Sequence, residues 1–176
     1  AMIMMVVIYA IGYRKVPPNN AMVLFRGRPD KGGEAVYVIQ GGGRFMLPGS
    51  GNYVLLEMDT DLVEFQMTGV PTKSEGGPVT LRLNVATIWR IVGDNESLLR
   101  AAGTLINKTR GENEMSVKGE LEKAITNLCR GYSWQAVQSD SDLVKNKVTE
   151  EANQALAGLG LEIMTTEFLK IRPQGA

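Results

Sequence analysis

An alternation of apolar and polar side chains over residues 79–91 constrains the fold of this chain most strongly. The odd positions are apolar apart from Thr87, whereas Arg82 and Arg90 stand among the even ones. A period of two is typical of a β-strand with one face in a core and the other toward water. The pattern therefore predicts one long strand, Val79–Ile91, in a half-buried sheet.

Four shorter apolar runs precede the long strand and predict a strand-rich first half. They lie between stretches rich in glycine, proline and asparagine, which are typical turn residues. The loop before the long strand is expected to cover residues 69–78. The four expected strands cover residues 21–25, 36–40, 53–59 and 62–68.

Helical periodicity replaces the alternation after Gly93. Three apolar stripes recur every three or four residues, and each predicts a helix that packs by one face. Asp94 is a candidate cap for the first helix, and Ser139 with Asp142 forms a candidate capping box for the third. The second helix is expected to begin at Met115, and a closing strand is predicted over residues 161–171. The stripes are Leu98, Leu99, Ala102, Leu105 and Ile106; Val117, Leu121, Ala124, Ile125 and Leu128; and Val144, Val148, Ala152, Ala155 and Leu159.

The beginning of the chain predicts a membrane segment over residues 1–12. No charge stands among residues 2–11, and the aromatic and basic residues that follow are typical of the headgroup region. Ten helical residues rise roughly 15 Å, about half of the hydrocarbon core, so we expect a truncated span or insertion into one leaflet. The expected anchoring residues are Met2, Ile3, Met4, Met5, Val6, Val7, Ile8, Tyr9, Ala10 and Ile11, and the expected headgroup contacts are Tyr13, Arg14 and Lys15.

Two other interpretations of this segment exist. A signal peptide fits less well, because its positive charges would precede the apolar run rather than follow it. A buried strand or helix of a soluble fold is the other alternative, but residues 2–11 leave no polar face for water.

A glycine-rich stretch over residues 41–51 carries a second membrane expectation. It lacks the Gly-Lys-Ser/Thr ending of a phosphate-binding loop, and no helical pattern follows it at once. Residues 41–43 are instead expected to form a hairpin turn with positive φ. Phe45, Met46 and Leu47 then place large apolar side chains at a loop tip, where water would surround them. We expect this tip to insert into lipid.

Composition narrows the chemistry that the chain can perform. It has 176 residues, no histidine and one cysteine, which excludes histidine-based catalysis, a cysteine-ligated zinc site and an internal disulfide. Lysine plus arginine equals aspartate plus glutamate at 19 each, which argues against nucleic acid as a partner. Cys129 lies beside a helical stripe and is expected to be buried and inert.

One pair of carboxylates is a candidate site. Asp59 and Asp61 could bind a cation or serve as acid and base, but no third ligand stands at suitable spacing. A solvated turn is the favoured interpretation. We therefore expect no enzyme activity, no cofactor and no metal site.

Several stretches carry a family resemblance when taken in order. They are VPPNNAMV at residues 16–23, GGRFMLP at 42–48, VTLRLNV at 79–85, LLRAA at 98–102 and the closing module from LGLEI at 159–163 to LKI at 169–171. This series resembles the SPFH superfamily of stomatins, prohibitins and flotillins, and it is most similar to flotillin-like proteins of the prokaryotic type. The resemblance covers residues 13–172.

The resemblance implies an α+β SPFH (prohibitin-homology) domain in two parts. A strand-rich first subdomain would cover residues 13–92, and a helix–helix–helix–strand second subdomain would cover residues 93–173. The long coiled coil of flotillins is expected to follow residue 176 in a longer protein. Animal flotillins are acylated near the N-terminus, but this chain has no cysteine there, so a hydrophobic anchor of the prokaryotic type is implied.

The implied function is a non-enzymatic membrane scaffold that organises lipid and protein microdomains, or lipid rafts. The implied partners are membrane lipids, further copies of the chain in rings or cages, and integral membrane client proteins. The alternative is an accessory subunit that regulates a membrane protease or channel. Arg14 and Lys15 follow the anchor, so the positive-inside rule predicts the cytoplasmic face of the plasma (inner) membrane.

Overall fold

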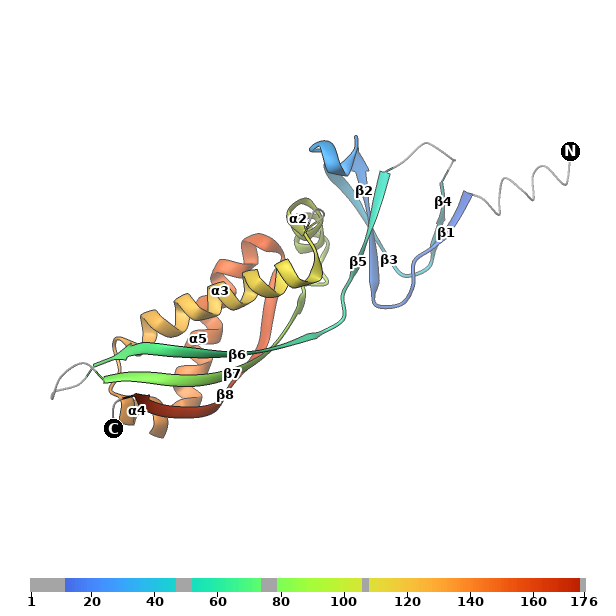
Figure 1. Ribbon diagram of the computed structural model, residues 1–176. Coiled ribbons are helices and arrows are strands. Elements are labelled where there is room, and N and C mark those ends of the chain that lie inside the picture. Colours follow the sequence, from blue (N-terminus) through green and yellow to red (C-terminus); the bar gives the residue numbers. More distant parts are fainter. Residues whose placement is uncertain (1–11, 47–51, 74–78, 106–107, 175–176) are drawn as a thin grey trace, which may run out of the picture. The chain divides into compact units, whose positions relative to one another are not determined.

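A computed structural model describes residues 12–46, 52–73, 79–105 and 108–174 of the chain (Figure 1). The chain divides into two compact units, and each unit is built from two separate stretches of sequence. Unit 1 comprises residues 1–59 and 91–108, and unit 2 comprises residues 60–90 and 109–176.

The described part of unit 1 contains two small sheets and one helix. An antiparallel ladder joins β1 (Tyr13–Lys15) to β4 (Gly43–Phe45), and a three-stranded sheet has the order β3-β2-β5. Helix α2 (Asn95–Leu105) packs against all three strands of that sheet. The strands of the larger sheet are β2 (Asn20–Arg26), β3 (Glu34–Gln40) and β5 (Asn52–Glu57), and a short 3-10 turn, η1 (Pro29–Lys31), joins β2 to β3.

The core of unit 1 lies around the central strand β2. Ala21, Met22 and Val23 are at most 1% exposed, and α2 adds buried leucine and alanine side chains. The backbone N–H of Ser97 donates to the Asp94 Oδ1 at 2.9 Å, which confirms the predicted cap. Hydrogen bonds from Ser97 lower the pKa of Asp94, because they stabilise its charged form.

The predicted hairpin after β3 is wrong. Gly41 and Gly42 do have positive φ, at 69° and 74°, as a glycine turn requires. However, β3 pairs with β2, whereas β4 pairs with β1, so the turn carries the chain from one sheet to the other. A glycine run marks a reversal of the chain, but it does not specify which strand the next strand will pair with.

Unit 2 is a three-stranded sheet covered by helices on one face (Figure 1). The sheet has the order β6-β7-β8, with β6 (Asp61–Thr72), β7 (Val79–Ile91) and β8 (Leu161–Gln174). In the described residues α3 (Arg110–Cys129) contacts β6, α5 (Ser141–Leu156) contacts β8, and the two helices contact each other. The remaining elements are the short helix α4 (Trp134–Ser139) and the 3-10 turn η2 (Ala157–Leu159).

The long strand is confirmed with the predicted bounds. Its side chains at odd positions from Leu81 to Ile91 are buried, and those at even positions are half-buried or exposed. Thr87 is buried as well, and its Oγ1 donates to the backbone oxygen of Thr165 at 2.9 Å. One face of the sheet therefore forms a core with the helices. We call the other face, which no helix of the described part of unit 2 covers, the bare face.

The loop predicted over residues 69–78 is wrong in its first part. Strand β6 continues to Thr72, and the register with β7 shifts between Met67 and Val70. Gly69 lies at this shift with φ of 74°. A glycine bulge inside a strand resembles a loop in sequence, because glycine and proline are typical of both.

The second helix begins five residues earlier than predicted. Thr109 and Glu112 form a capping box, in which the Thr109 N–H donates to the Glu112 Oε2 at 2.6 Å. The first turns of α3 carry polar residues that face water, so no apolar stripe marks them.

The capping box predicted at Ser139 is also wrong. Ser139 ends α4, a helix that periodicity did not reveal, and Asp140 precedes α5 without a side-chain cap bond. Ser133 caps α4 by accepting from the Ala136 N–H at 3.1 Å. In α5, Leu156 is buried, whereas Ala155, which the apolar stripe predicts to be buried, is exposed.

The predicted elements occur in the predicted order, with β1, β4 and α4 in addition, but the two compact units do not divide at residue 92. The described residues place α2 with the strands of unit 1, and they place β6 and β7 with α3 and α5 in unit 2. Contacts between elements that are distant in sequence define these units, and a change of periodicity along the chain does not report them.

Candidate functional site

The structure brings two predicted membrane-contacting stretches together in unit 1. Tyr13 pairs with Phe45, Arg14 with Arg44, and Lys15 with Gly43 in the antiparallel ladder of β1 and β4. Backbone hydrogen bonds extend the ladder, from Met46 N to Gly12 O at 2.7 Å and from Val16 N to Gly42 O at 2.9 Å. We call residues 12–16 and 42–46 the β1–β4 ribbon.

The two faces of the β1–β4 ribbon differ in chemistry. Side chains directly opposite each other in an antiparallel pair lie on the same face, and successive residues alternate between faces. Tyr13, Phe45 and Lys15 therefore share one face, and Arg14 and Arg44 share the other. Tyr13 and Phe45 are each 41% exposed, so the first face presents two aromatic rings to the surroundings.

Two glycines make room for these rings. A Cβ atom at Gly12 would lie 2.8 Å from the Phe45 Cζ, and a Cβ atom at Gly43 would collide with the Tyr13 ring. Side chains at these positions would therefore displace the rings. Glycine within a strand often marks such a close approach.

One part of the loop prediction is wrong. Phe45 does not lie at a loop tip but ends strand β4, because its backbone is held by pairing with β1. Met46 follows it and is half-buried. Leu47 lies outside the described residues, as do the predicted anchoring residues 2–11.

The β1–β4 ribbon carries three cations and no acidic residue. Arg14 and Arg44 are exposed and lie directly opposite each other, an arrangement in which like charges destabilise a strand pair. The Arg44 guanidinium also lies 5.0 Å from the centre of the Tyr37 ring. A negatively charged surface against the ribbon would offset this repulsion.

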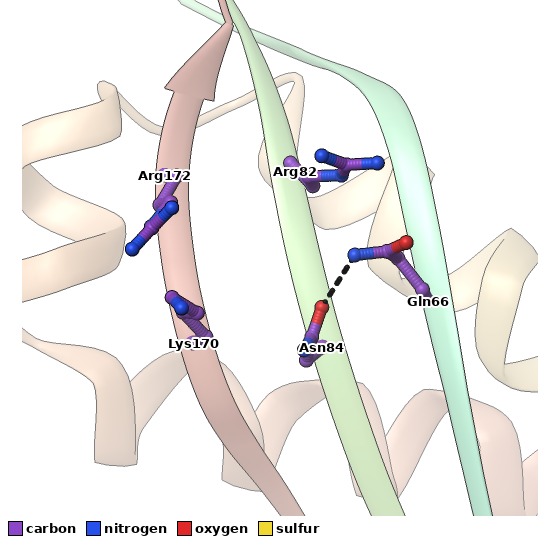
Figure 2. Close-up of a pocket in the computed structure, with 5 residues that line it drawn as sticks. All are labelled: Gln66, Arg82, Asn84, Lys170 and Arg172. Atoms are coloured by element: carbon purple, nitrogen blue, oxygen red, sulfur yellow. Dashed lines mark hydrogen bonds between the residues drawn. The ribbon is translucent and has the colours of Figure 1, made fainter.

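A second basic site lies on the bare face of the sheet in unit 2 (Figure 2). Gln66, Arg82, Asn84, Lys170 and Arg172 line a shallow hollow of about 110 Å³, which we call the basic hollow. The Gln66 Nε2 donates to the Asn84 Oδ1 at 2.8 Å. Sequence reasoning missed this site, although Arg82 stood among the even positions of the long strand and Lys170 and Arg172 are two residues apart.

The described residues place the candidate catalytic and metal-binding side chains as follows. Within them, no group of three or more His, Cys, Asp or Glu side chains is placed to hold a metal ion. Cys129 is fully buried, as predicted, and burial raises the pKa of its thiol to about 11. The predicted solvated turn at Asp59 and Asp61 needs one correction, because Asp61 forms an ion pair with Arg110 and is only 13% exposed.

No helix within the described ranges has both the length and the apolar character needed to cross a membrane.

Comparison with known proteins supports the resemblance inferred from the residue patterns. The model of the SPFH domain / Band 7 family matches residues 14–175. The chain belongs to this family. The matched SPFH domain includes the β1–β4 ribbon, apart from Gly12 and Tyr13, and the whole basic hollow.

One curated relative of this SPFH domain is the flotillin-like protein FloT of Bacillus subtilis (strain 168). It is 22% identical over 178 residues, which cover 97% of this chain and 34% of FloT. The chain thus spans about a third of the length of that relative. The order of elements in this chain, a strand-rich first part followed by helices and a closing strand, agrees with the α+β fold expected from the resemblance.

Proposed function

We propose that this SPFH domain is the membrane-contacting part of a non-enzymatic scaffold that organises lipid and protein microdomains. The observation that carries the proposal is the β1–β4 ribbon, which sets Tyr13 beside Phe45 and Arg14 beside Arg44. The apolar residues 2–11 precede this ribbon directly in sequence. Membership of the family and the similarity to a flotillin-like protein support a membrane scaffold role in general.

The chemistry of the ribbon suits the boundary between lipid and water. Aromatic rings favour the headgroup region, where an apolar body and a polar tip can both be accommodated. Basic side chains near a membrane surface are attracted to anionic lipids by about 1 kcal/mol each. In the proposed arrangement the ribbon enters the headgroup layer edge-on. Tyr13 and Phe45 on one face then contact the upper acyl chains, while Lys15 on that face and Arg14 and Arg44 on the other bind headgroup phosphates.

Spin labelling of the whole chain tests this contact directly. Cys129 is buried, so a nitroxide attaches selectively to an introduced cysteine at Phe45→Cys. On vesicles that contain anionic lipid, this label is expected to become accessible to oxygen and protected from a water-soluble relaxation agent. A label at the exposed Gln138→Cys in α4 serves as the matched control and should stay in water. A label at position 45 that remains fully aqueous on vesicle-bound protein would contradict the proposal.

Self-assembly is the second part of the proposal. The strands β6 and β8 are edges of their sheet in the described residues, and such edges can join neighbouring copies into rings or cages. Electron microscopy of the detergent-extracted full-length protein tests this. Strictly monomeric particles would exclude a self-assembling scaffold.

We also propose that the domain faces the cytoplasm at the plasma (inner) membrane. Arg14 and Lys15 follow the apolar run, and cationic residues that flank a membrane segment are retained on the cytoplasmic side. Protease treatment of intact cells and of inverted vesicles distinguishes the two faces. Digestion of the domain in intact cells would reverse this orientation.

The alternative function, an accessory subunit of a membrane protease or channel, makes a different prediction. A second integral membrane protein should then co-purify in a fixed ratio with the full-length protein. Recovery of the protein only with copies of itself and lipid would favour the scaffold.

A further inference from the structure

The basic hollow of unit 2 gathers three cations on the bare face of the sheet (Figure 2). Arg82 comes from β7, and Lys170 and Arg172 come from the last part of β8, so the sheet itself sets their spacing. All three side chains are exposed. Among the described residues, none of the three forms an ion pair with a carboxylate.

Such a cluster favours an anionic ligand. Like charges that share one face raise the local positive potential, and a negative group against them removes the repulsion. Arginine guanidinium groups are planar forks that bind carboxylates in a bidentate way. Because the Asn84 Oδ1 accepts from Gln66, the Asn84 amide nitrogen retains its donors for a ligand.

The rest of unit 2 supplies the complementary charge. The sequence of this unit contains eleven lysines and arginines but thirteen aspartates and glutamates, so its net charge is negative although the hollow is positive. Asp142 and Glu167 both pair with Lys145, each at 2.7 Å, and their side chains are 88% and 55% exposed. We call these two carboxylates around Lys145 the acidic edge, where one ammonium group neutralises only one of two charges.

The two charged sites cannot readily meet within one copy. Glu167 and Lys170 are three residues apart on β8, and their contacts rather than their spacing place them, because the neighbouring Thr166 also contacts α5. The Glu167 carboxylate is engaged by Lys145 of α5, on the side of the helices, whereas the basic hollow opens on the bare face. Charge complementarity is therefore available between copies.

We propose that the basic hollow of one copy binds the acidic edge of a second copy of this chain. Different surfaces then meet, which makes the contact heterologous, and repeated heterologous contacts generate rings or open filaments. This inference rests on the proposed self-assembling scaffold, and it assigns the surfaces through which unit 2 would take part. The expected contact joins Arg82, Lys170 and Arg172 to the carboxylates of Asp142 and Glu167.

Zero-length cross-linking of the whole chain tests the contact. A carbodiimide joins a lysine to a carboxylate only when the two groups touch, and an equal mixture of ¹⁴N- and ¹⁵N-labelled protein distinguishes links between copies from links within one copy. Links between copies are expected from Lys170 to Asp142 or Glu167. Their absence, or links between copies that involve only other residues, would overturn the proposal.

Charge reversal provides the second test. Arg82→Glu with Arg172→Glu should weaken self-association in sedimentation velocity by about tenfold or more at low salt, because like charges would then face each other. Adding Asp142→Arg to the same chain should restore much of the loss. Lys123→Glu with Arg130→Glu reverses two exposed charges on α3 and its C-cap and serves as the control with the same net charge. Equal effects of both pairs, or no recovery on adding Asp142→Arg, would overturn the proposal.

Vesicle binding separates this inference from the membrane contact. The Arg82→Glu, Arg172→Glu variant should bind vesicles as the original chain does, since the β1–β4 ribbon is unchanged. If it loses vesicle binding while self-association persists, the hollow binds lipid phosphate rather than a second copy, and the proposal is wrong. If the label at position 45 stays in water while the cross-links between copies still form, only the proposed membrane contact is contradicted.

Discussion

Tyr13 lies directly opposite Phe45 in the antiparallel pairing of β1 with β4. Side chains in such positions have Cβ atoms about 4.5–5.5 Å apart, so the two rings present one combined surface. One of them was predicted to lie at the headgroups and the other at an inserting loop tip. Their pairing shows that the two predictions describe a single surface, and it leads to several measurable expectations.

Removal of both rings should weaken membrane binding. Tyr13→Ser with Phe45→Ser is expected to raise the lipid concentration for half-maximal binding by about thirtyfold, which corresponds to about 2 kcal/mol of apolar burial. Vesicle flotation of the whole chain measures this. Leu62→Ser with Leu169→Ser is the matched control, because both leucines are exposed in unit 2, at 59% and 60%. Equal binding by the original chain and the Tyr13, Phe45 variant would show that the rings do not contact lipid.

Glycine at position 43 should be needed for the same surface. In Gly43→Ala the new methyl group would collide with the Tyr13 ring and displace it, so vesicle binding should fall toward that of Tyr13→Ser. Gly103→Ala in α2 is the opposite case, because its Cβ would meet no atom within 4 Å. That substitution should stabilise the chain by about 0.5–1 kcal/mol in urea unfolding without a change in binding. Undiminished vesicle binding by Gly43→Ala would contradict the role of the Tyr13 ring.

The opposed arginines should set a preference for anionic lipid. Arg14→Gln with Arg44→Gln is expected to lower binding to anionic vesicles by about 2 kcal/mol at low salt, and it should scarcely change binding to zwitterionic ones. High salt should remove the difference, since it screens exposed charges. Arg26→Gln with Arg28→Gln alters two exposed arginines elsewhere in unit 1 and should have a smaller effect. If both pairs act alike, net charge rather than the ribbon governs binding.

The capping box of α3 should contribute to the stability of unit 2. Thr109→Ala removes the side chain that accepts from the Glu112 N–H, and the expected loss is about 1 kcal/mol in the free energy of unfolding. Urea unfolding followed by circular dichroism measures it. Thr126→Ala, a half-buried threonine near the other end of α3, is the comparison. An equal or larger loss at Thr126 would contradict a specific role of the cap.

Cys129 should make stability fall at alkaline pH. Burial raises the pKa of its thiol from 9.0 to about 11, so the folded chain retains the proton while the unfolded chain releases it. The contribution is complete below about pH 9 and declines as pH rises toward 11; near pH 10 the free energy of unfolding should be lower by about 1.4 kcal/mol. Cys129→Ala lacks this decline, so the difference between the two chains isolates it from the titration of lysines and tyrosines. Parallel pH profiles for the two chains would contradict the assignment.

Periodicity along the chain was enough to predict most elements of this domain. The alternation over residues 79–91 predicted β7 with its bounds, and the apolar stripes of α2, α3 and α5 predicted three helices. These signals are local, because burial of one face imposes a repeat of two on a strand and of 3.6 on a helix. Where burial was weak, at the polar start of α3 and in the six residues of α4, the prediction failed.

Strand pairing required the folded chain. The residues of the ribbon could be named from sequence as an aromatic and basic stretch and an apolar stretch, but nothing local shows that Tyr13 meets Phe45. The same holds for the basic hollow, where Arg82 joins Lys170 and Arg172 across β7 and β8, and for the grouping of β6 and β7 with the helices of unit 2. Composition and periodicity determine which residues are buried and in what local structure, whereas the register between strands distant in sequence depends on how whole elements pack.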